Sequence, residues 1–336
     1  MEDFLWTIIA QFREIYTRIK HHFQFVNEFL LFREITNHVK YSINIYSHNT
    51  LNRVSFYIIA NLFHPKTVDM CFGHSGYEGV PGIKDSNNEF NINGHSSRLI
   101  PVTEEELMLF ASLYDPEGTP PLRARLPALH SRELINVLEK FAAQPRKLGD
   151  LHNEYFSTVM FDETYAQRDG TIRRHTQFPD NSEELILQGP HFFVGNPLYQ
   201  TPQSECNTNR SYDVLDLTEL PDDYLPRTNY VPACSREEYE GRTPKVPWDG
   251  KLVTEHYRMA FRRMFGPSAE RSLIGAMFPK NNGHIHPVLS FIFKNEMGLI
   301  TFSGLSCSII FDFFLKTTGR TDVYESTLRT LPVPLQ

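Results

Sequence analysis

The stretch from about residue 162 to residue 250 constrains the fold of this chain more than any other feature. Prolines recur through it from Pro190 to Pro247, with many asparagines between them. Because proline fixes φ and has no backbone N–H, it does not lie inside long helices or central strands. We therefore predict connections and short strands here, two of them over 184–189 and 191–196. Long connections in compact proteins usually carry function or a partner surface, and we expect one here.

Before this stretch, the spacing of apolar residues predicts helices and strands together. Apolar residues three and four apart predict a helix over 3–34, and Tyr and Ile alternating with small polar residues predict a half-buried strand over 41–47. Thr103, with Glu106 three residues later, has the spacing of a capping box and predicts a helix over 103–114.

Three further segments complete the first part of the chain. Residues 73–94 are rich in Gly, Asn, Asp and Ser and predict a loop. Prolines predict an extended conformation over 118–127, since each residue before a proline is pushed out of the helical region. A second capped helix is predicted over 131–144.

The last third also mixes the two kinds of element. It predicts a helix over 253–266 with a Thr254 cap, strands over 271–279 and 287–294, and a buried helix or strand–helix pair over 298–319. The fold class that we predict is therefore mixed α/β (α+β). A helical N-terminal region would occupy residues 1–150, and a mixed domain residues 151–336.

Composition limits the partners and the compartment. The 336 residues carry a net charge of −7, so any DNA binding would depend on local basic patches rather than on the overall field. Four cysteines without a C-x-x-C spacing indicate a reducing cytoplasm and argue against a zinc ribbon. No apolar run reaches the ~20 residues of a membrane span, and we expect a cytoplasmic protein with no membrane contact.

The segment Asn196-Pro197-Leu198-Tyr199 raises the question of catalysis. Enzymes that methylate the adenine amino group carry an Asn/Asp-Pro-Pro-Tyr/Phe loop, in which Asn binds the amine and the aromatic ring stacks on the flipped base. Here Leu198 replaces the second proline, and we interpret the segment as a structural turn. The catalytic alternative, with Asn196, Pro197 and Tyr199 as its residues, stays open.

No convincing loop for S-adenosylmethionine accompanies this segment. Such a loop needs an apolar strand that ends in a Gly-x-Gly turn, where the backbone can approach the ligand closely. Residues 71–82 supply glycines without a clean strand before them, and residues 300–307 supply a predicted strand with one glycine.

Eight strings of the chain resemble one family; they cover residues 21–47, 56–69, 80–85, 190–206, 212–239, 242–250, 311–320 and 326–334. Together they resemble the C-terminal half of large bacterial adenine-specific DNA methyltransferases. These belong to type II restriction–modification systems and to phage-defence systems such as DISARM and BREX. In such proteins the catalytic core comes first, with its S-adenosylmethionine loop and a true Asn-Pro-Pro-Tyr, and the string like "GNPLYQTP" lies downstream of it.

The resemblance implies different functions for the two parts of the chain. Residues 1–150 would be a spacer that follows a catalytic core missing from this chain, and residues 151–336 would be a target-recognition domain. S-adenosylmethionine is the cofactor of the family, and none is expected for this chain alone. The implied partners are double-stranded DNA and a methyltransferase catalytic half or other defence-system subunits.

Three basic strings are candidates for DNA contact. On the predicted helix 253–266, Arg258 and Arg262 share a face with Arg263 beside it, although a solvated helix face would look the same. Between prolines, the second string offers side chains that can contact bases or phosphates: Arg227, Asn229 and Tyr230. The third string, 316–320, resembles a phosphate clamp through Lys316 and Arg320.

Two weaker signals remain. Residues 168–177 contain Arg168, Arg173, Arg174 and His175, which form either a plain surface turn or a further backbone contact. His284 and His286 are two apart, but two histidines seldom hold a metal without a third ligand, so we predict no metal.

The function that these features predict is sequence recognition for an adenine-N6 DNA methyltransferase, by a chain that is inactive alone. Two alternatives remain: a complete, divergent methyltransferase, and a protein–protein adaptor of a defence complex.

Overall fold

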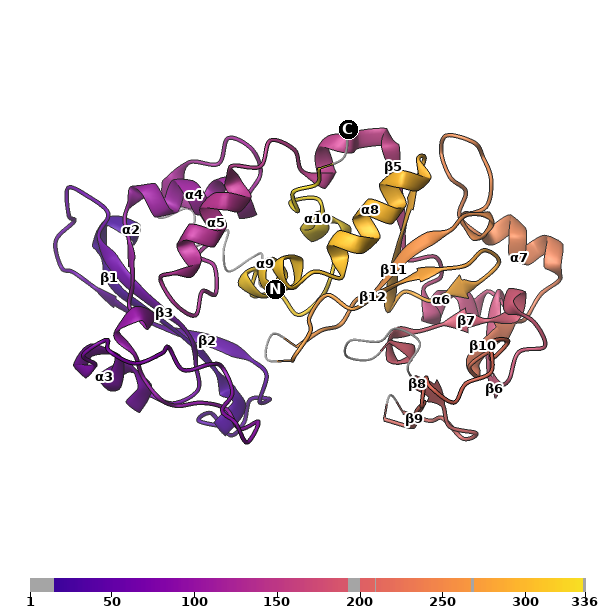
Figure 1. Cartoon of the computed structure of the whole chain (residues 1–336), viewed down its shortest axis with the longest axis horizontal. Coiled ribbons are helices and arrows are strands. Elements are labelled where there is room, and N and C mark those ends of the chain that lie inside the picture. Colours follow the sequence, from indigo (N-terminus) through magenta and orange to yellow (C-terminus); the bar gives the residue numbers. More distant parts are fainter. Residues whose placement is uncertain (1–14, 193–199, 209, 267–268, 335–336) are drawn as a thin grey trace. The chain divides into compact units, whose positions relative to one another are not determined.

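The chain forms two compact units, each with its own sheet and its own core. We describe residues 15–192, 200–208, 210–266 and 269–334 of a computed structural model (Figure 1). The first unit comprises residues 1–145 with 317–319, and the second comprises 146–316 with 320–336. Helices and several small mixed or antiparallel sheets occur together, which confirms the mixed α/β class.

The first unit is built on a four-stranded sheet. Its strands are β1 (Ile19–Val26), β2 (Lys40–Tyr46), β3 (Phe56–Leu62) and β4 (Ile100–Val102), in the spatial order β2-β1-β3-β4. Strands β1 and β3 run parallel, and the other two pairs are antiparallel. The strand predicted over 41–47 is therefore confirmed, although most of its side chains are exposed rather than half-buried.

The helix predicted over 3–34 is wrong over β1. Within that range the structure shows the short α2 (Ile15–Arg18) and one 3-10 turn, Asn27–Phe29, and residues 3–14 lie outside the described residues. Phe23 and Phe25 are both buried, and they pair across the ladder with Ile43 and Tyr41 of β2. In a β-strand, side chains two residues apart lie on the same face of the sheet. Hydrogen bonding to two neighbouring strands outweighs the helix-like spacing that precedes this segment.

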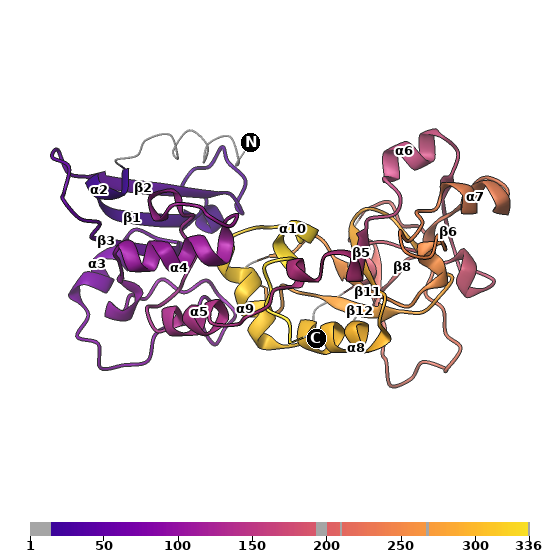
Figure 2. The same ribbon diagram turned by 90° about the horizontal axis from the view of Figure 1, so that it is seen from above.

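Three longer helices accompany this sheet: α3 (Lys66–Gly73), α4 (Glu104–Tyr114) and α5 (Leu134–Ala142). Figure 2 shows α4 and α5 together on one side of the sheet. The predicted capping box of α4 is confirmed, since the backbone N–H of Thr103 donates to Glu106 at 2.7 Å. The helix predicted over 131–144 exists as α5, but it starts without a side-chain cap, so that cap was wrong.

The two segments predicted to lack helices behave differently. Residues 74–94 contain neither helix nor strand, as expected. Residues 118–127 begin in a turn at Gly118, which has a φ of 81°, and include one 3-10 turn, Pro121–Arg123, with extended residues on either side of it.

The second unit is centred on an antiparallel sheet. Its strands are β5 (Tyr155–Thr158), β11 (Arg258–Arg262), β12 (Gly275–Phe278) and β14 (Val288–Phe293), in the order β12-β11-β14-β5. The strands predicted over 271–279 and 287–294 are confirmed by β12 and β14.

The helix predicted over 253–266 is wrong. A 3-10 turn, Val253–Glu255, leads into β11, which pairs with β12 on one side and with β14 on the other. Met259 and Phe261 of β11 are buried in the sheet, so this string forms a central strand instead of a helix.

Residues 298–319 lie in two helices, α8 (Glu296–Ser306) and α9 (Ile309–Thr317). Phe302 of α8 packs on the sheet, with its ring centroid 5.8 Å from that of Phe261 and 5.5 Å from that of Phe291. Among the described residues no single helix has the length and apolarity to cross a membrane, and only the α8–α9 pair, bent by 71°, passes that test together.

The proline-rich stretch forms small strand pairs and short helices around this sheet. The pairs are β6 (Ile172–Gln177) with β10 (Thr228–Pro232), β7 (Ile186–Leu187) with β13 (Gly283–His284), and β8 (Gln200–Pro202) with β9 (Tyr212–Val214). The short helices of the unit are α6 (Glu163–Arg168), α7 (Arg236–Arg242) and α10 (Glu325–Leu328). The prediction of short strands is confirmed at 184–189 by β7, whereas 191–192 are not a strand and the rest of 191–196 lies outside the described residues.

Candidate nucleic-acid interface

Arg258, the first arginine of the predicted basic helix, lies in the core of the second unit. Its side chain is fully buried, and one terminal nitrogen donates to the carbonyl of Asn282 at 2.5 Å. The guanidinium also lies 5.9 Å from the ring centroid of Phe278. Burial lowers the pKa of Arg258 to about 10. Since the side chain exposes no surface, it supports the fold rather than a DNA contact in this conformation.

The two other arginines of this string are half-buried and bind carbonyl groups. Arg262 donates to the carbonyl of Phe192 at 3.1 Å. Arg263 donates to the carbonyl of His286 at 3.0 Å and lies over the ring of Tyr324, 4.7 Å from its centroid. The shared helix face predicted for these arginines does not exist, because β11 is a strand.

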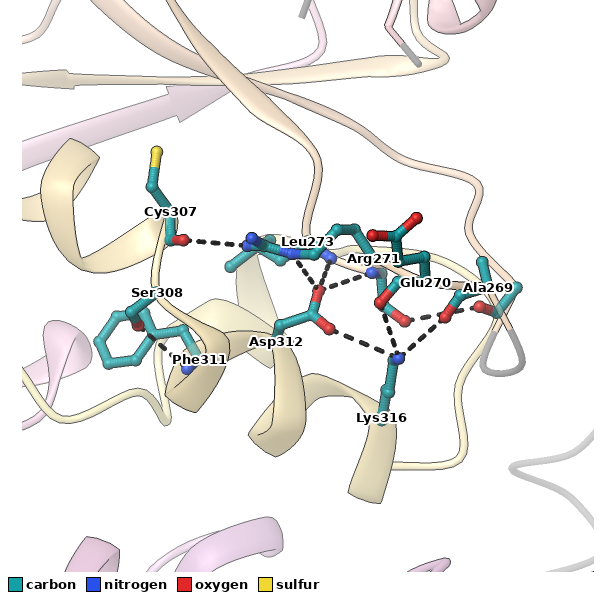
Figure 3. Close-up of polar contacts among 11 residues, drawn as sticks. Ala269, Glu270, Arg271, Leu273, Cys307, Ser308, Phe311, Asp312 and Lys316 are labelled. Carbon is teal, nitrogen blue, oxygen red and sulfur yellow. Dashed lines mark hydrogen bonds and ion pairs between the residues drawn. The ribbon is translucent and has the colours of Figure 1, made fainter. Parts of the chain in front are cut away.

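Lys316, from the predicted phosphate clamp, belongs to a polar cluster around the buried Asp312 (Figure 3). One oxygen of Asp312 accepts from the backbone N–H groups of Ser272 and Leu273, at 2.6 and 2.8 Å. Arg271 and Lys316 lie 3.4 and 3.6 Å from the same carboxylate. A buried carboxylate between two cations and two N–H donors is well compensated.

The rest of this cluster fixes the segment before β12 onto α9. The ammonium of Lys316 donates to the carbonyls of Ala269 and Glu270, at 2.8 and 3.1 Å, as Figure 3 shows. Arg271 donates to the carbonyl of Cys307 at 3.1 Å. Lys316 therefore has a structural role here, and a phosphate would have to displace these contacts. Arg320, its predicted partner, is half-buried.

Strands β6 and β10 bring together two strings that the sequence singled out separately. Their antiparallel pairing places Tyr230 opposite Arg174 and Val231 opposite Arg173. Figure 1 shows these strands side by side, with β8 and β9 next to them. We call this pair, together with Phe178 and Arg227 directly beyond its Gln177–Thr228 end, the β6–β10 ribbon. It holds Arg227 and Asn229–Tyr230 within a few residues of the basic string 168–177.

Asn229 and Tyr230 of the ribbon are buried, contrary to the role predicted for them at a DNA surface. The amide of Asn229 donates to the sulfur of Cys206 and the hydroxyl of Tyr212, both at 3.1 Å. The hydroxyl of Tyr230 donates to the carboxylate of Glu163. Both side chains hold the ribbon on the unit beneath it.

Arg227 differs from these two neighbours because its side chain is half-exposed. Its guanidinium lies 4.3 Å from the ring centroid of Phe178, and half of the surface of this phenylalanine is exposed. One terminal nitrogen donates to the carbonyl of Pro202 at 3.3 Å. The sequence prediction included Arg227 but missed Phe178, and only an aromatic residue next to a basic strand hinted at it.

The strongest exposed charge of the ribbon lies on β6. Arg173, Arg174 and His175 are consecutive and exposed. The side chain of Arg174 donates to the carbonyl of Cys206, whereas the side chains of Arg173 and His175 make no hydrogen bond or ion pair with any described residue. No carboxylate among the described residues forms an ion pair with Arg173 or Arg174, so their charge is available to an anionic partner.

Neither of the two glycine-containing strings proposed for the methyl donor has the predicted local structure. Asn196, Pro197 and Tyr199 lie outside the described residues. Residues 71–82 begin in α3 and continue as loop, and residues 300–307 lie in α8 and its end, where a strand was predicted. Neither string is an apolar strand that ends in a glycine turn, so these two strings do not fit S-adenosylmethionine.

His284, one of the two histidines noted for a possible metal, bonds a side chain of the protein core. His284 is fully buried and shares a hydrogen bond of 2.8 Å with the hydroxyl of Ser290. Burial, and then the nearby charge of Arg258, lower the pKa of His284 to about 3. No group of three His, Cys, Asp or Glu side chains suited to a metal occurs in the part of the chain that the structure describes.

Comparison with known proteins gives no family for the chain. No family model matches it, and no curated protein matches its sequence.

Proposed function

We propose that this chain is the DNA-recognition portion of an S-adenosylmethionine-dependent adenine-N6 DNA methyltransferase, and that the β6–β10 ribbon contacts the DNA. The observation that supports this most is the pairing of two separate basic strings into one ribbon. It carries three consecutive exposed basic residues, Arg173 to His175, and Arg227 lies at one end of it, next to the residue paired with Gln177. The resemblance of the sequence to target-recognition regions supports the same function.

A β-ribbon with exposed basic side chains is an element that can contact DNA. The major groove of B-DNA admits a two-stranded β-ribbon as well as an α-helix. Cations on such a ribbon bind phosphates and release counterions, which supplies affinity without sequence preference. The net charge of −7 makes a local basic site necessary, because the chain as a whole repels DNA.

Methyl transfer itself is assigned to a partner. In the family reaction, the catalytic core binds the methyl donor and the flipped adenine, and the recognition region holds the duplex in register. Neither glycine-containing string of this chain fits the donor, so we assign donor binding to a methyltransferase catalytic half.

Binding to duplex DNA over a salt series tests this function. We expect log Kd to rise steeply with log salt for the full chain, since each phosphate contact contributes a slope of about 0.9. The double variant R173A/H175A should bind about 3- to 30-fold more weakly at low salt and lower the slope by about one to two. The control R236A removes an exposed arginine of α7, which is paired with Glu240 and Glu183, and should bind like the parent. Equal affinities for parent and double variant would remove the ribbon from the interface.

Protein docking is a second candidate function, favoured by apolar side chains exposed on the first unit. Ile43, Ile45 and Tyr46 of the edge strand β2 each expose 44–50% of their surface. The segment Phe29–Phe32 adds four more exposed apolar side chains. Clustered exposed apolar residues mark interaction sites. A chain that only docks on other proteins would show no salt-dependent DNA binding, and the salt series separates the two functions.

A further inference from the structure

Arg227 is held in a more defined position than the other exposed cations of the ribbon. Its backbone N–H donates to the hydroxyl of Thr201 at 2.8 Å, and its carbonyl shares a hydrogen bond of 2.9 Å with the imidazole of His191. His191 and Thr201 are both buried, so Arg227 is anchored to the core through its backbone. The preceding Pro226 is also buried and fixes the chain at this point.

The side chain of Arg227 is equally restricted. The ring of Phe178 covers the guanidinium at 4.3 Å, and the hydrogen bond to Pro202 uses one of the terminal nitrogens, Nη1. A stacked guanidinium keeps its N–H donors in one plane. Less rotamer freedom is then lost when these donors bind a partner.

One edge of this guanidinium has no partner within the described residues. Nε and Nη2 make no hydrogen bond there, and no carboxylate pairs with Arg227. These two N–H groups point in parallel, and they fit a ligand with two acceptor atoms in one plane. Two chemistries in DNA offer such a pair: the O6 and N7 atoms of guanine in the major groove, and the oxygens of a phosphate.

We propose that Arg227 is a specificity-determining residue that reads a guanine through O6 and N7 in the major groove, with Phe178 as the positioning residue that orients it. This inference rests on the proposed DNA-recognition function. Arg227 is fixed both through its backbone N–H and through the ring of Phe178, which is the preorganisation that bidentate readout of a base requires. A bidentate contact with a phosphate is the other outcome of the test below. The neighbouring Arg173 and His175, which are exposed and make no contact with a described carboxylate, suit the phosphates instead.

Selection from a random duplex pool, followed by base substitution, tests the inference. The full chain is used to select a consensus, and each guanine in it is then replaced by 7-deazaguanine, which lacks the N7 acceptor, or by inosine, which keeps O6 and N7. At one guanine we expect 7-deazaguanine to weaken binding by roughly 10- to 100-fold, and inosine to change it less than about threefold.

Variants assign that guanine to Arg227. R227K keeps the charge but replaces the planar pair of donors by a single ammonium, so it should reduce the discrimination between the 7-deazaguanine and guanine duplexes. R227M has no N–H donor in its side chain and should bind the two duplexes equally. F178A keeps Arg227 but removes the ring that restricts its guanidinium. It should reduce the preference for the guanine duplex over the 7-deazaguanine duplex several-fold. R236K serves as the matched arginine-to-lysine control outside the ribbon and should keep the full discrimination of the parent.

The failures are distinguishable. If the full chain binds no duplex at low salt, the proposed function is wrong and this inference falls with it. If the chain binds DNA and R227A weakens all duplexes uniformly with a lower salt slope, Arg227 contacts a phosphate and only this inference is overturned. Discrimination that persists unchanged in R227M would also overturn it.

Discussion

Strands β11 and β6 carry similar basic strings, yet they place their arginines in opposite environments. β11 is an inner strand with a neighbour on each side, so Arg258 is buried and donates to a backbone carbonyl. β6 has one neighbour, and Arg173 lies exposed without a partner among the described residues. A basic string therefore indicates a binding surface only where its N–H donors do not already bond other groups of the protein.

The largest expected effect is the loss of Arg258. Truncation in R258A leaves a cavity and a buried carbonyl at Asn282 without its donor, and should lower the free energy of unfolding by about 3–5 kcal/mol. R258M fills most of the volume and removes a buried charge, so it should cost less than R258A. Urea denaturation measures both. A loss below about 1 kcal/mol in R258A would show that Arg258 is not a core residue, and the contrast with β6 would disappear.

A somewhat smaller effect is expected at Asp312. D312A removes the acceptor of two backbone N–H groups and leaves Lys316 and Arg271 without their carboxylate, which should cost about 2–4 kcal/mol of unfolding free energy. D312N keeps an acceptor oxygen and loses only the charge, so about half of that loss is expected. The loss of unfolding free energy in D312A is measured at low salt and at about 1 M salt. If the high salt abolishes the loss, Asp312 forms an exposed ion pair rather than a buried one.

Local signals in the sequence predicted the elements that depend on local contacts. The start of α4 followed from Thr103 and Glu106, because a capping box is formed by residues three apart. β1 and β11 were mistaken for helices, since their partners lie far along the chain and only the sheet gives their apolar residues a strand environment. Tertiary pairing outweighs intrinsic propensity in such strands.

The candidate site was predictable only in part. Residues 168–177 and 225–232 stood out by their composition, but their pairing joins segments far apart in the chain and no local rule predicts it. The sequence could not distinguish Arg227, whose side chain is half-exposed, from Asn229 and Tyr230, whose side chains are buried and bonded to Cys206 and Glu163. Burial of a polar side chain depends on which distant groups satisfy it.

Burial in the sheet that contains β11 should also make the stability of the chain depend on pH, through His284. His284, buried beside Arg258, has a pKa of about 3 in the folded chain, against about 6.5 when unfolded. Between these values the unfolded chain binds a proton that the folded chain does not, so stability is highest above about pH 6.5 and falls as the pH falls. The expected slope is about 1.4 kcal/mol per pH unit for this group.

Urea denaturation of the parent and of H284Q between about pH 7 and pH 5 measures that slope. The amide introduced by H284Q cannot titrate but can still hydrogen-bond Ser290. The slope of unfolding free energy against pH should therefore be smaller in the variant by the contribution of one proton, about 1.4 kcal/mol per pH unit. Buried His22 and His191 and half-buried His130 also have lowered pKa values, so some dependence should remain. H175Q, on the exposed ribbon, is the matched control for the loss of a surface histidine. Identical slopes for the parent and H284Q would mean that His284 takes up its proton while the chain is folded. The environment of β11 would then be open to water, and burial could no longer be the property that separates its arginines from those of the ribbon.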